Sequence, residues 1–394
     1  MNPSPSPPPL KRSTSSDSDA EPLTDPVSVP SPLTSTSFVD ILTYIESKDV
    51  SVADMMKQRA LVPFPALEAF KPLHTMYLLQ RANFWVEQEI SFDQDRTSYN
   101  EKLTPSERHV VSTILAFFAS ADGLAAKVQK GFLKVFDAIP EAARLLNFQT
   151  MMEDIHALTY IEKLKAVHAN PQDILLLSFG LVSVPTVSAK IEWARRYMNN
   201  DTLPISVKMF AQACNEGVMF SSSFTILYYF RSKGAIPGIG HANELISRDE
   251  NFHVFTYGLL EDCLSEESES SQADNEFLTK IYGQKKITQD EAHQILASAV
   301  DVEIEFAKYA LSGGINGLTL ELMVQQIKWF ANVVLAAYKF EELYPGIEPI
   351  EFMRSFGNTV ANNKNNFFER RSGAYARVSE QKRAPAIPCI GDCI

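Results

Sequence analysis

The sequence contains very little cysteine. Four cysteines occur in 394 residues, and they are too few and too widely scattered to form a disulfide framework in a protein of this length. They are Cys214, Cys263, Cys389 and Cys393. Proteins of reducing compartments rarely contain disulfides, so this composition indicates an intracellular protein. We therefore expect the protein to be cytoplasmic.

Long apolar runs and basic stripes are absent too. No run of about 18 uninterrupted apolar residues occurs, so the sequence predicts no transmembrane span. Acidic residues outnumber basic ones, 48 against 36, and the net charge is -12. No basic stripe with interleaved aromatic residues is found, and both features argue against a nucleic-acid-binding protein. We expect neither a membrane nor a nucleic acid among the partners.

Serine, proline and threonine dominate the beginning of the sequence, as in SPSPPPLKRSTSSDSDAEPL. Such a composition cannot bury enough apolar surface to fold, so we expect residues 1–37 to form a disordered tail. The tail contains Asp17, Asp19, Glu21 and Asp25, and acidic residues count against an organellar transit peptide.

From Phe38 onward the sequence has the periodicity of helices, and strand-like alternation is rare. Thr104–Glu107 is a capping box with proline at the first helical position, and Thr288–Glu291 repeats the capping box. The pattern predicts long helices near residues 104–136, 141–168, 172–198, 205–232, 241–263, 288–311 and 318–340. We therefore expect residues 38–372 to form one large all-α bundle.

One predicted helix carries three polar side chains on one face. In EDIHALTY, residues 153–160, the side chains of Glu153, His156 and Tyr160 fall within an arc of about 60° if each residue turns the helix by about 100°. The neighbouring turns are apolar, and a buried carboxylate beside a buried imidazole is costly unless something compensates them. A metal ion could do so. For one such motif, an ion pair with a hydrogen-bonded core histidine is the simpler interpretation.

A second Glu-x-x-His motif favours the metal. Glu250 and His253 repeat the spacing, and each motif follows a lone acidic residue in an apolar stretch one predicted helix earlier. These acidic residues are Asp122 before the first motif and Glu216 before the second. The two intervals are similar, and each suits a helix, a turn and a returning antiparallel helix. The pattern is typical of four-helix di-metal carboxylate proteins, and its carboxylates and imidazoles favour iron or manganese.

These motifs are part of a longer stretch of sequence that resembles a known protein family. The sequence resembles the small, radical-generating subunit of class I ribonucleotide reductase, of the eukaryotic type, over about residues 60 to 378. The most specific segment is NELISRDE at residues 243–250. Other matching segments are ANFWVEQEI at 82–90, residues 115–123, residues 148–160, Pro237-Gly238 and NFFERR at 366–371. The resemblance implies an all-α, ferritin-like di-metal carboxylate helical bundle.

The resemblance also implies roles for particular residues. The metal ligands would be Asp122, Glu153, His156, Glu216, Glu250 and His253, and they would hold two iron ions per protomer, with manganese as an alternative. Tyr160 would carry the stable radical. Trp85 and Asp249 would connect His156 to the surface, and Tyr375 would pass the radical on.

The expected partners follow from the same likeness. The protein would form a homodimer, or a heterodimer with a paralogue, and its flexible tail at residues 373–394 would dock on a separate large subunit. That large subunit would reduce ribonucleotides to deoxyribonucleotides. This protein, which has no glycine-rich phosphate loop, would not bind the substrate itself.

The C-terminal tail departs from the family pattern. Eukaryotic members usually end in an acidic and aromatic segment, whereas this sequence ends in AIPCIGDCI, with Cys389 and Cys393 and no terminal aromatic residue. The tail either docks on a diverged large subunit or has a separate redox role.

Two other functions compete with the radical-generating one. A metal-free accessory subunit conflicts with six intact ligands, and a two-electron di-metal oxidase would have no use for Trp85, Tyr160 and Tyr375.

Overall fold

A computed structural model of the protein describes residues 70–354, except 137–138, 182, 199, 201 and 264–284. For residues 120–130, 178 and 181 only the backbone is described. The tail predicted at 1–37 and the tail predicted at 373–394 lie outside the described residues, and so do Tyr375, Cys389 and Cys393.

The described residues form helices joined by loops, and the prediction of an all-α protein is confirmed. The helices are α3 (Lys71–Ala82), α4 (Asp95–Lys102), α5 (Pro105–Phe136), α6 (Pro140–Val167), α7 (Pro171–Leu181), α8 (Pro185–Met198), α9 (Ile205–Gly217), α10 (Ser221–Ser232), α11 (Pro237–Asp262), α13 (Gln289–Ala310) and α14 (Leu320–Ala337), with the short 3-10 helices η2 (Glu87–Glu89) and η3 (Glu351–Met353). Within the described ranges no strand occurs, and an isolated bridge joins Ile315 to Leu318. None of the described helices is long and apolar enough to cross a membrane.

Helix starts follow the local sequence. At α5 the predicted capping box forms, because the Glu107 N–H donates to Thr104 Oγ1 and the Thr104 N–H donates to the Glu107 carboxylate. The same reciprocal hydrogen bonds join Thr288 and Glu291 at the start of α13. Proline occupies an early position in α3, α6 and α11, where its missing N–H removes no intrahelical hydrogen bond.

The prediction of one helix over residues 172–198 is wrong, because two helices occupy this range. α7 ends at Leu181 and α8 begins at Pro185. Proline has no N–H for an intrahelical hydrogen bond and its ring clashes with the preceding turn, so it starts a helix rather than continuing one.

The helix predicted for residues 205–232 is also broken, just after Glu216. A Cβ at Gly217 would lie 2.6 Å from Val334 Cγ2, so the glycine permits a close approach of α9 to α14. The Met219 N–H then bonds to the Cys214 carbonyl, five residues back, over 3.1 Å. This widened turn ends α9, and Phe220 becomes the N-cap of α10.

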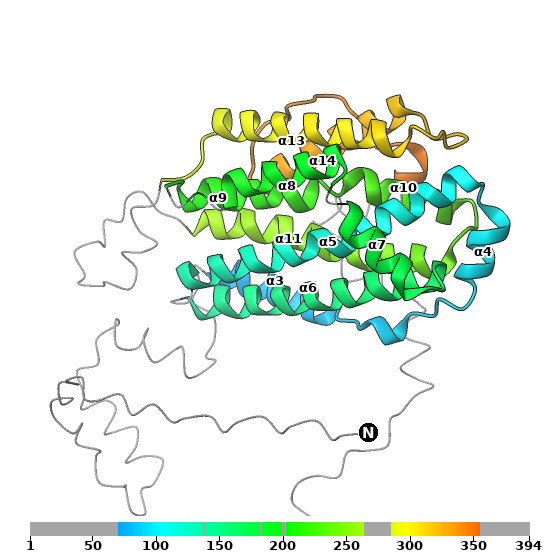
Figure 1. Cartoon of the computed structure of the whole chain (residues 1–394). Helices are drawn as coiled ribbons and strands as arrows, with labels where there is room; N and C mark the ends of the chain where they lie inside the picture. Colours follow the sequence, from blue (N-terminus) through cyan, green and yellow to red (C-terminus); the bar gives the residue numbers. More distant parts are fainter. Residues whose placement is uncertain are drawn as a thin grey trace, which may run out of the picture. The chain divides into compact units, whose positions relative to one another are not determined.

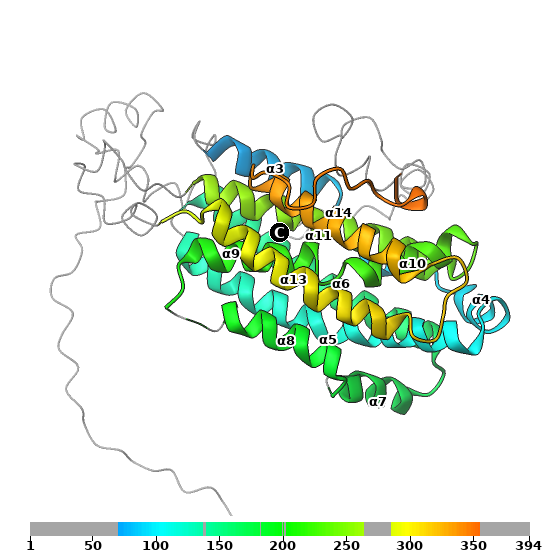
Figure 2. The ribbon, with the colours of Figure 1, turned by 90° about the horizontal axis from the view of Figure 1, so that it is seen from above.

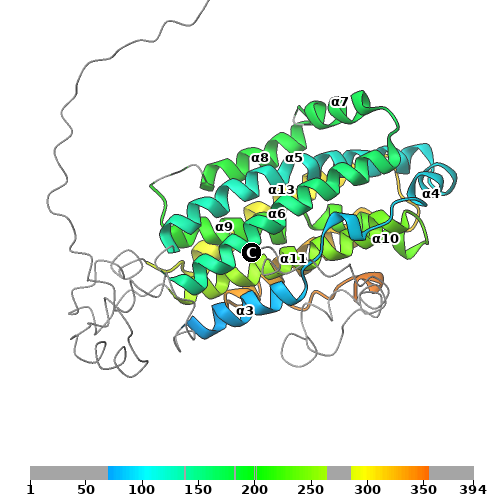
Figure 3. The same ribbon diagram turned by 90° about the horizontal axis from the view of Figure 1, so that it is seen from below.

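The long helices lie side by side (Figure 1). α5 packs along α6, α9 packs along α11, and α11 also contacts α6, so the two helix pairs meet. α13 and α14 pack together on one side of these pairs (Figure 2), whereas α3 lies against α6 and α11 on the other (Figure 3). The two Glu-x-x-His motifs, on α6 and α11, therefore lie inside the bundle.

Candidate metal centre

Helix α6 presents the first motif on its buried face, as the spacing predicts. Glu153, His156 and Tyr160 are 1%, 0% and 0% exposed. His156 Nδ1 lies 3.5 Å from Glu153 Oε2. Tyr160 follows His156 by four positions, so the phenol lies about one helical turn beyond the imidazole.

Helices α9 and α11 bring the second half of the site against the first. His253 Nδ1 lies 3.1 Å from Glu153 Oε1 and 3.6 Å from Glu216 Oε2. On the other side, His156 Nδ1 lies 3.1 Å from Glu250 Oε1. Glu153, Glu216, Glu250 and His253 each offer one ligand atom, and these atoms lie within 4.8 Å of one another. With His156, they form one buried cluster.

The groups of this cluster shift one another's pKa values. Burial disfavours charge on His156, but the three surrounding carboxylates outweigh burial and hold the pKa of the imidazole well above its ordinary value. Burial raises the pKa of Glu216 to about 7. At Glu153 the contacts with His156 and His253 outweigh burial and lower the pKa to about 2. Protons on the histidines therefore balance the carboxylates, and metal binding would displace those protons.

The cluster offers the donors that metal ions need. Both carboxylate oxygens of Glu250 and both ring nitrogens of His253 lack a hydrogen bond of ordinary geometry among the described residues. Buried polar atoms are rarely left in this state, because it is costly. Carboxylate oxygens and imidazole nitrogens suit iron or manganese. The residues therefore fit a di-metal site. Asp122 lies in α5, but its side chain is not described, so its place among the ligands stays a prediction.

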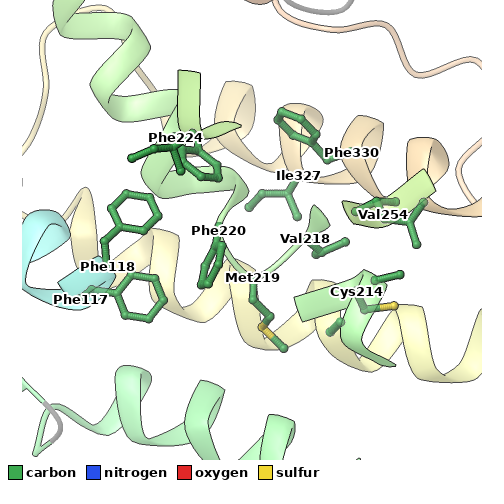
Figure 4. Close-up of a cluster of buried hydrophobic side chains, with 14 of the residues drawn as sticks. Phe117, Phe118, Cys214, Val218, Met219, Phe220, Phe224, Val254, Ile327 and Phe330 are labelled. Atoms are coloured by element: carbon green, nitrogen blue, oxygen red, sulfur yellow. The ribbon is translucent and has the colours of Figure 1, made fainter. Parts of the chain in front are cut away.

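An aromatic cluster lies beside Tyr160. The ring of Phe118 stacks on the ring of Tyr160, with centroids 4.6 Å apart and an interplanar angle of 9°. Phe220 and Phe224 pack against Phe118 at centroid distances of 5.6 and 4.9 Å (Figure 4). Lys163 Nζ lies 4.4 Å from the centroid of the Tyr160 ring. The Tyr160 ring thus packs on one member of an aromatic cluster and has a buried amine over its face.

A hydrogen-bonded path leads from His156 to Trp85. The Trp85 indole N–H donates to Asp249 Oδ2 over 2.7 Å, and the same oxygen lies 3.4 Å from His156 Nε2. Arg248 lies 3.1 Å from the other oxygen of Asp249. Burial opposes ionisation of Asp249, but Arg248 and His156 outweigh burial and lower the pKa of the carboxyl. The structure thus brings together three residues that the sequence linked through resemblance alone, whereas Tyr375 lies outside the described residues.

Three residues at the site are not anticipated from the sequence. Tyr257 and Gln212 both donate to Glu216 Oε1, over 3.1 and 2.6 Å, and Lys163 is fully buried. The signal for Tyr257 is its spacing, since it follows the second motif as Tyr160 follows the first. Lys163 has no such signal, because lysines in helices are mostly exposed.

The fold and the site define a class. Antiparallel helix pairs that enclose a buried cluster of glutamates and histidines are characteristic of di-metal carboxylate bundle proteins. Residues 69–349 match a family model described as "Ribonucleotide reductase, small chain". The protein therefore belongs to the ribonucleotide reductase small-chain family, a family of oxidoreductases, as the resemblance predicts.

Two relatives show the extent of the likeness. The sequence is 31% identical over 317 residues to the ribonucleoside-diphosphate reductase small chain of Neurospora crassa, an alignment that covers 79% of this protein and 71% of that one. It is 31% identical over 304 residues to the ribonucleoside-diphosphate reductase small chain of Nicotiana tabacum, with 77% of this protein and 85% of that one covered.

Solved structures establish the fold. The ribonucleotide reductase Rnr4 homodimer of Saccharomyces cerevisiae superposes with a TM-score of 0.62 at 24% identity, covering 77% of this protein and 89% of that one. The ribonucleotide reductase R2 subunit from Clostridium botulinum gives a TM-score of 0.61 at 23% identity, with coverages of 74% and 88%. The predicted ferritin-like bundle is confirmed.

Proposed function

We propose that the protein is the radical-generating small subunit of a ribonucleoside-diphosphate reductase and acts in the cytoplasm. Tyr160 is oxidised to a radical, and the oxidising equivalent passes to a separate large subunit that reduces ribonucleotides to deoxyribonucleotides. The metal ligands are Asp122, Glu153, His156, Glu216, Glu250 and His253, which hold two iron ions. One observation carries the proposal: a buried cluster of glutamates and histidines lies one helical turn from a buried tyrosine.

The carboxylates of the cluster differ in their placement. Glu153 and Glu250 each approach both histidines, at distances of 3.1 to 3.5 Å. Each would therefore be able to hold a metal beside either histidine, whereas Glu216 lies beside His253. Iron held there in the ferrous state would supply the electrons for O2 and the oxidising power that a phenol requires.

Asp249 orients His156. Because Asp249 Oδ2 lies 3.4 Å from His156 Nε2, the carboxylate favours the tautomer with its proton on Nε2. Nδ1 then faces Glu153 and Glu250 and is available to a metal, an arrangement common behind metal-bound histidines. The hydrogen bond from Trp85 to the same carboxylate extends the path. We propose this path as the first part of the route by which the oxidising equivalent leaves, with Tyr375 at its far end.

The aromatic rings around Tyr160 protect the radical. A tyrosyl radical is lost when a reductant reaches it, and the side chains of Phe118, Phe220 and Phe224 are at most 3% exposed. These rings exclude water and small reductants from the neighbourhood of the phenol.

We propose that the protein forms a homodimer through α6 and α7, which contact each other. Leu158 on α6 and Leu176 and Phe179 on α7 are 54%, 72% and 74% exposed, and large exposed apolar side chains are candidates for an interaction site. Leu176→Glu/Phe179→Glu should convert a dimer to a monomer in light scattering. Leu78→Glu on α3, also at an exposed apolar residue, should leave the dimer intact.

The radical is tested by electron paramagnetic resonance after anaerobic iron loading and exposure to O2. The wild-type protein should give a tyrosyl signal, and Tyr160→Phe should bind the same amount of iron with that signal lost or replaced. Tyr99→Phe is the matched control, because the buried Tyr99 hydroxyl bonds to Ser112 rather than to the cluster. This variant should keep the signal.

Other outcomes would contradict the proposal. A protein that binds iron and forms no radical under any condition would instead be a two-electron oxidase. A protein that binds no metal would be an accessory subunit.

Truncation after residue 372 should preserve the radical and abolish binding to the large subunit in a pull-down with the two purified subunits. Parallel loading with manganese tests the identity of the metal.

A further inference from the structure

The sequence around the first motif is repeated around the second. Residues 153–160 read EDIHALTY and residues 250–257 read ENFHVFTY, so both fit Glu-x-x-His-x-x-Thr-Tyr. The repeat places a tyrosine four residues beyond each histidine, on α6 and on α11. Because both segments are helical, Tyr160 and Tyr257 lie at equivalent positions relative to their own motifs, about one turn beyond the histidine.

Tyr257 is in direct contact with the cluster. Its side chain is 0% exposed, and its hydroxyl donates to Glu216 Oε1 over 3.1 Å. The edge of the ring packs against Phe132, with centroids 5.7 Å apart. Tyr257 is therefore a buried phenol bonded directly to a ligand of the proposed metal site.

We propose that Tyr257 is a second oxidisable tyrosine of this centre, able to hold the oxidising equivalent on the α9/α11 side of the bundle. The proposal rests on the proposed function, because O2 reduced at the metal pair is the oxidant. The phenol loses one electron and its hydroxyl proton, which leaves along the hydrogen bond to Glu216, and becomes a neutral tyrosyl radical. Two ferrous ions, the phenol and one excess ferrous ion together supply the four electrons that reduce O2 to water.

The phenol of Tyr257 has a proton acceptor within hydrogen-bond distance. The Tyr257 hydroxyl donates to the Glu216 carboxylate, which favours departure of the proton with the electron. Tyr257 is therefore placed to be oxidised when Tyr160 is absent.

The test compares variants of the full-length protein after anaerobic loading with excess ferrous ion and exposure to O2. Tyr160→Phe should still give a radical whose hyperfine splitting collapses when ring-deuterated tyrosine is incorporated. Tyr160→Phe/Tyr257→Phe should bind the same amount of iron and lose that signal. Tyr160→Phe/Tyr338→Phe is the matched control, because Tyr338 is also buried but contacts Phe210 rather than a ligand. The control should keep the signal of Tyr160→Phe.

A second measurement does not depend on removing the phenol. Placing 3-fluorotyrosine at position 257 in the Tyr160→Phe protein keeps the hydroxyl and should add a fluorine splitting to the signal. A radical in the wild-type protein that is absent from Tyr160→Phe with full iron, or a signal that lacks the fluorine splitting, overturns this proposal alone. A wild-type protein that binds iron without forming any radical overturns the proposed function and this proposal with it.

Discussion

Replacing Lys190 by methionine should destabilise the protein by about 3–5 kcal/mol, because it leaves a buried carboxylate without its cation. Lys190 Nζ on α8 lies 2.6 Å from Glu303 Oε2 on α13, and the two side chains are 3% and 0% exposed. Lys190 also donates to the Met219 carbonyl over 2.6 Å. The Ser222 N–H donates to Glu303 Oε1 over 3.0 Å.

Removing both charges should cost far less than removing one. Burial lowers the pKa of Lys190 to about 8 in spite of Glu303, and burial raises the pKa of Glu303 in spite of Lys190. Burial therefore outweighs the attraction between the two ions. Lys190→Met/Glu303→Gln keeps an acceptor for the Ser222 N–H and places a thioether near the Phe306 ring, which now lies 3.5 Å from the ammonium. We expect its stability to lie within about 1–2 kcal/mol of wild type.

The pH dependence of the single variant gives a second check. The pKa of Glu303 is raised above its ordinary value of 4.5, and loss of Lys190 raises it further. Between these two pKa values the folded state keeps a proton that the unfolded state has released. The free energy of unfolding therefore falls as pH rises, by at most about 1.4 kcal/mol per pH unit. The deficit of Lys190→Met relative to the double variant should be smaller at pH 5 than at pH 8.

Urea unfolding followed by circular dichroism at the two pH values measures these differences. The reasoning is refuted if Lys190→Met is as stable as the double variant at pH 8. It is also refuted if the deficit grows toward pH 5, because the sign of the proton linkage would then be wrong.

Three further changes test other parts of the bundle. Asp249→Asn removes the charge behind His156, a ligand in the proposed function, and iron affinity measured by chelator competition should fall about 10–100-fold. Gly258→Ala would place a Cβ 2.2 Å from a backbone oxygen of α14, so thermal unfolding should show a loss of about 1–3 kcal/mol. Gly131→Ala, with nothing within 4 Å, is its control and should be neutral or stabilising. Thr288→Ala removes the capping box of α13 and should cost about 1 kcal/mol in the same assay.

The parts of the fold that the sequence predicted depend on local signals. Helix periodicity and the capping boxes at Thr104 and Thr288 require only neighbouring residues. The two breaks that were not predicted have different origins. At Pro185 a local signal was present, but the apolar pattern continues on both sides of it. The break after Gly217 involves a close approach to α14, more than one hundred residues later in the sequence, and no local window contains that information.

The same distinction applies to the candidate site. Repetition of a motif singled out Glu153 and Glu250, which the structure brings together in one cluster, because the motif depends only on spacing within single helices. Lys163 and Lys190 are buried lysines whose placement depends on residues of other helices. From the sequence each looks like an ordinary helical lysine with its amine in water. A pattern of spacing can therefore find residues that share a helix face, but it cannot find lysines whose burial depends on other helices.

The two halves of the cluster share their ligand pattern but not their surroundings. His156 Nε2 faces the carboxylate of Asp249 at 3.4 Å, and that carboxylate continues to Trp85. His253 Nε2 has no hydrogen-bond partner among the described residues. An imidazole backed by a carboxylate is held in one tautomer and is the stronger metal donor. In the proposed function, the path toward the large subunit therefore begins at His156, and Tyr257, on the other half, would hold an oxidising equivalent away from that path.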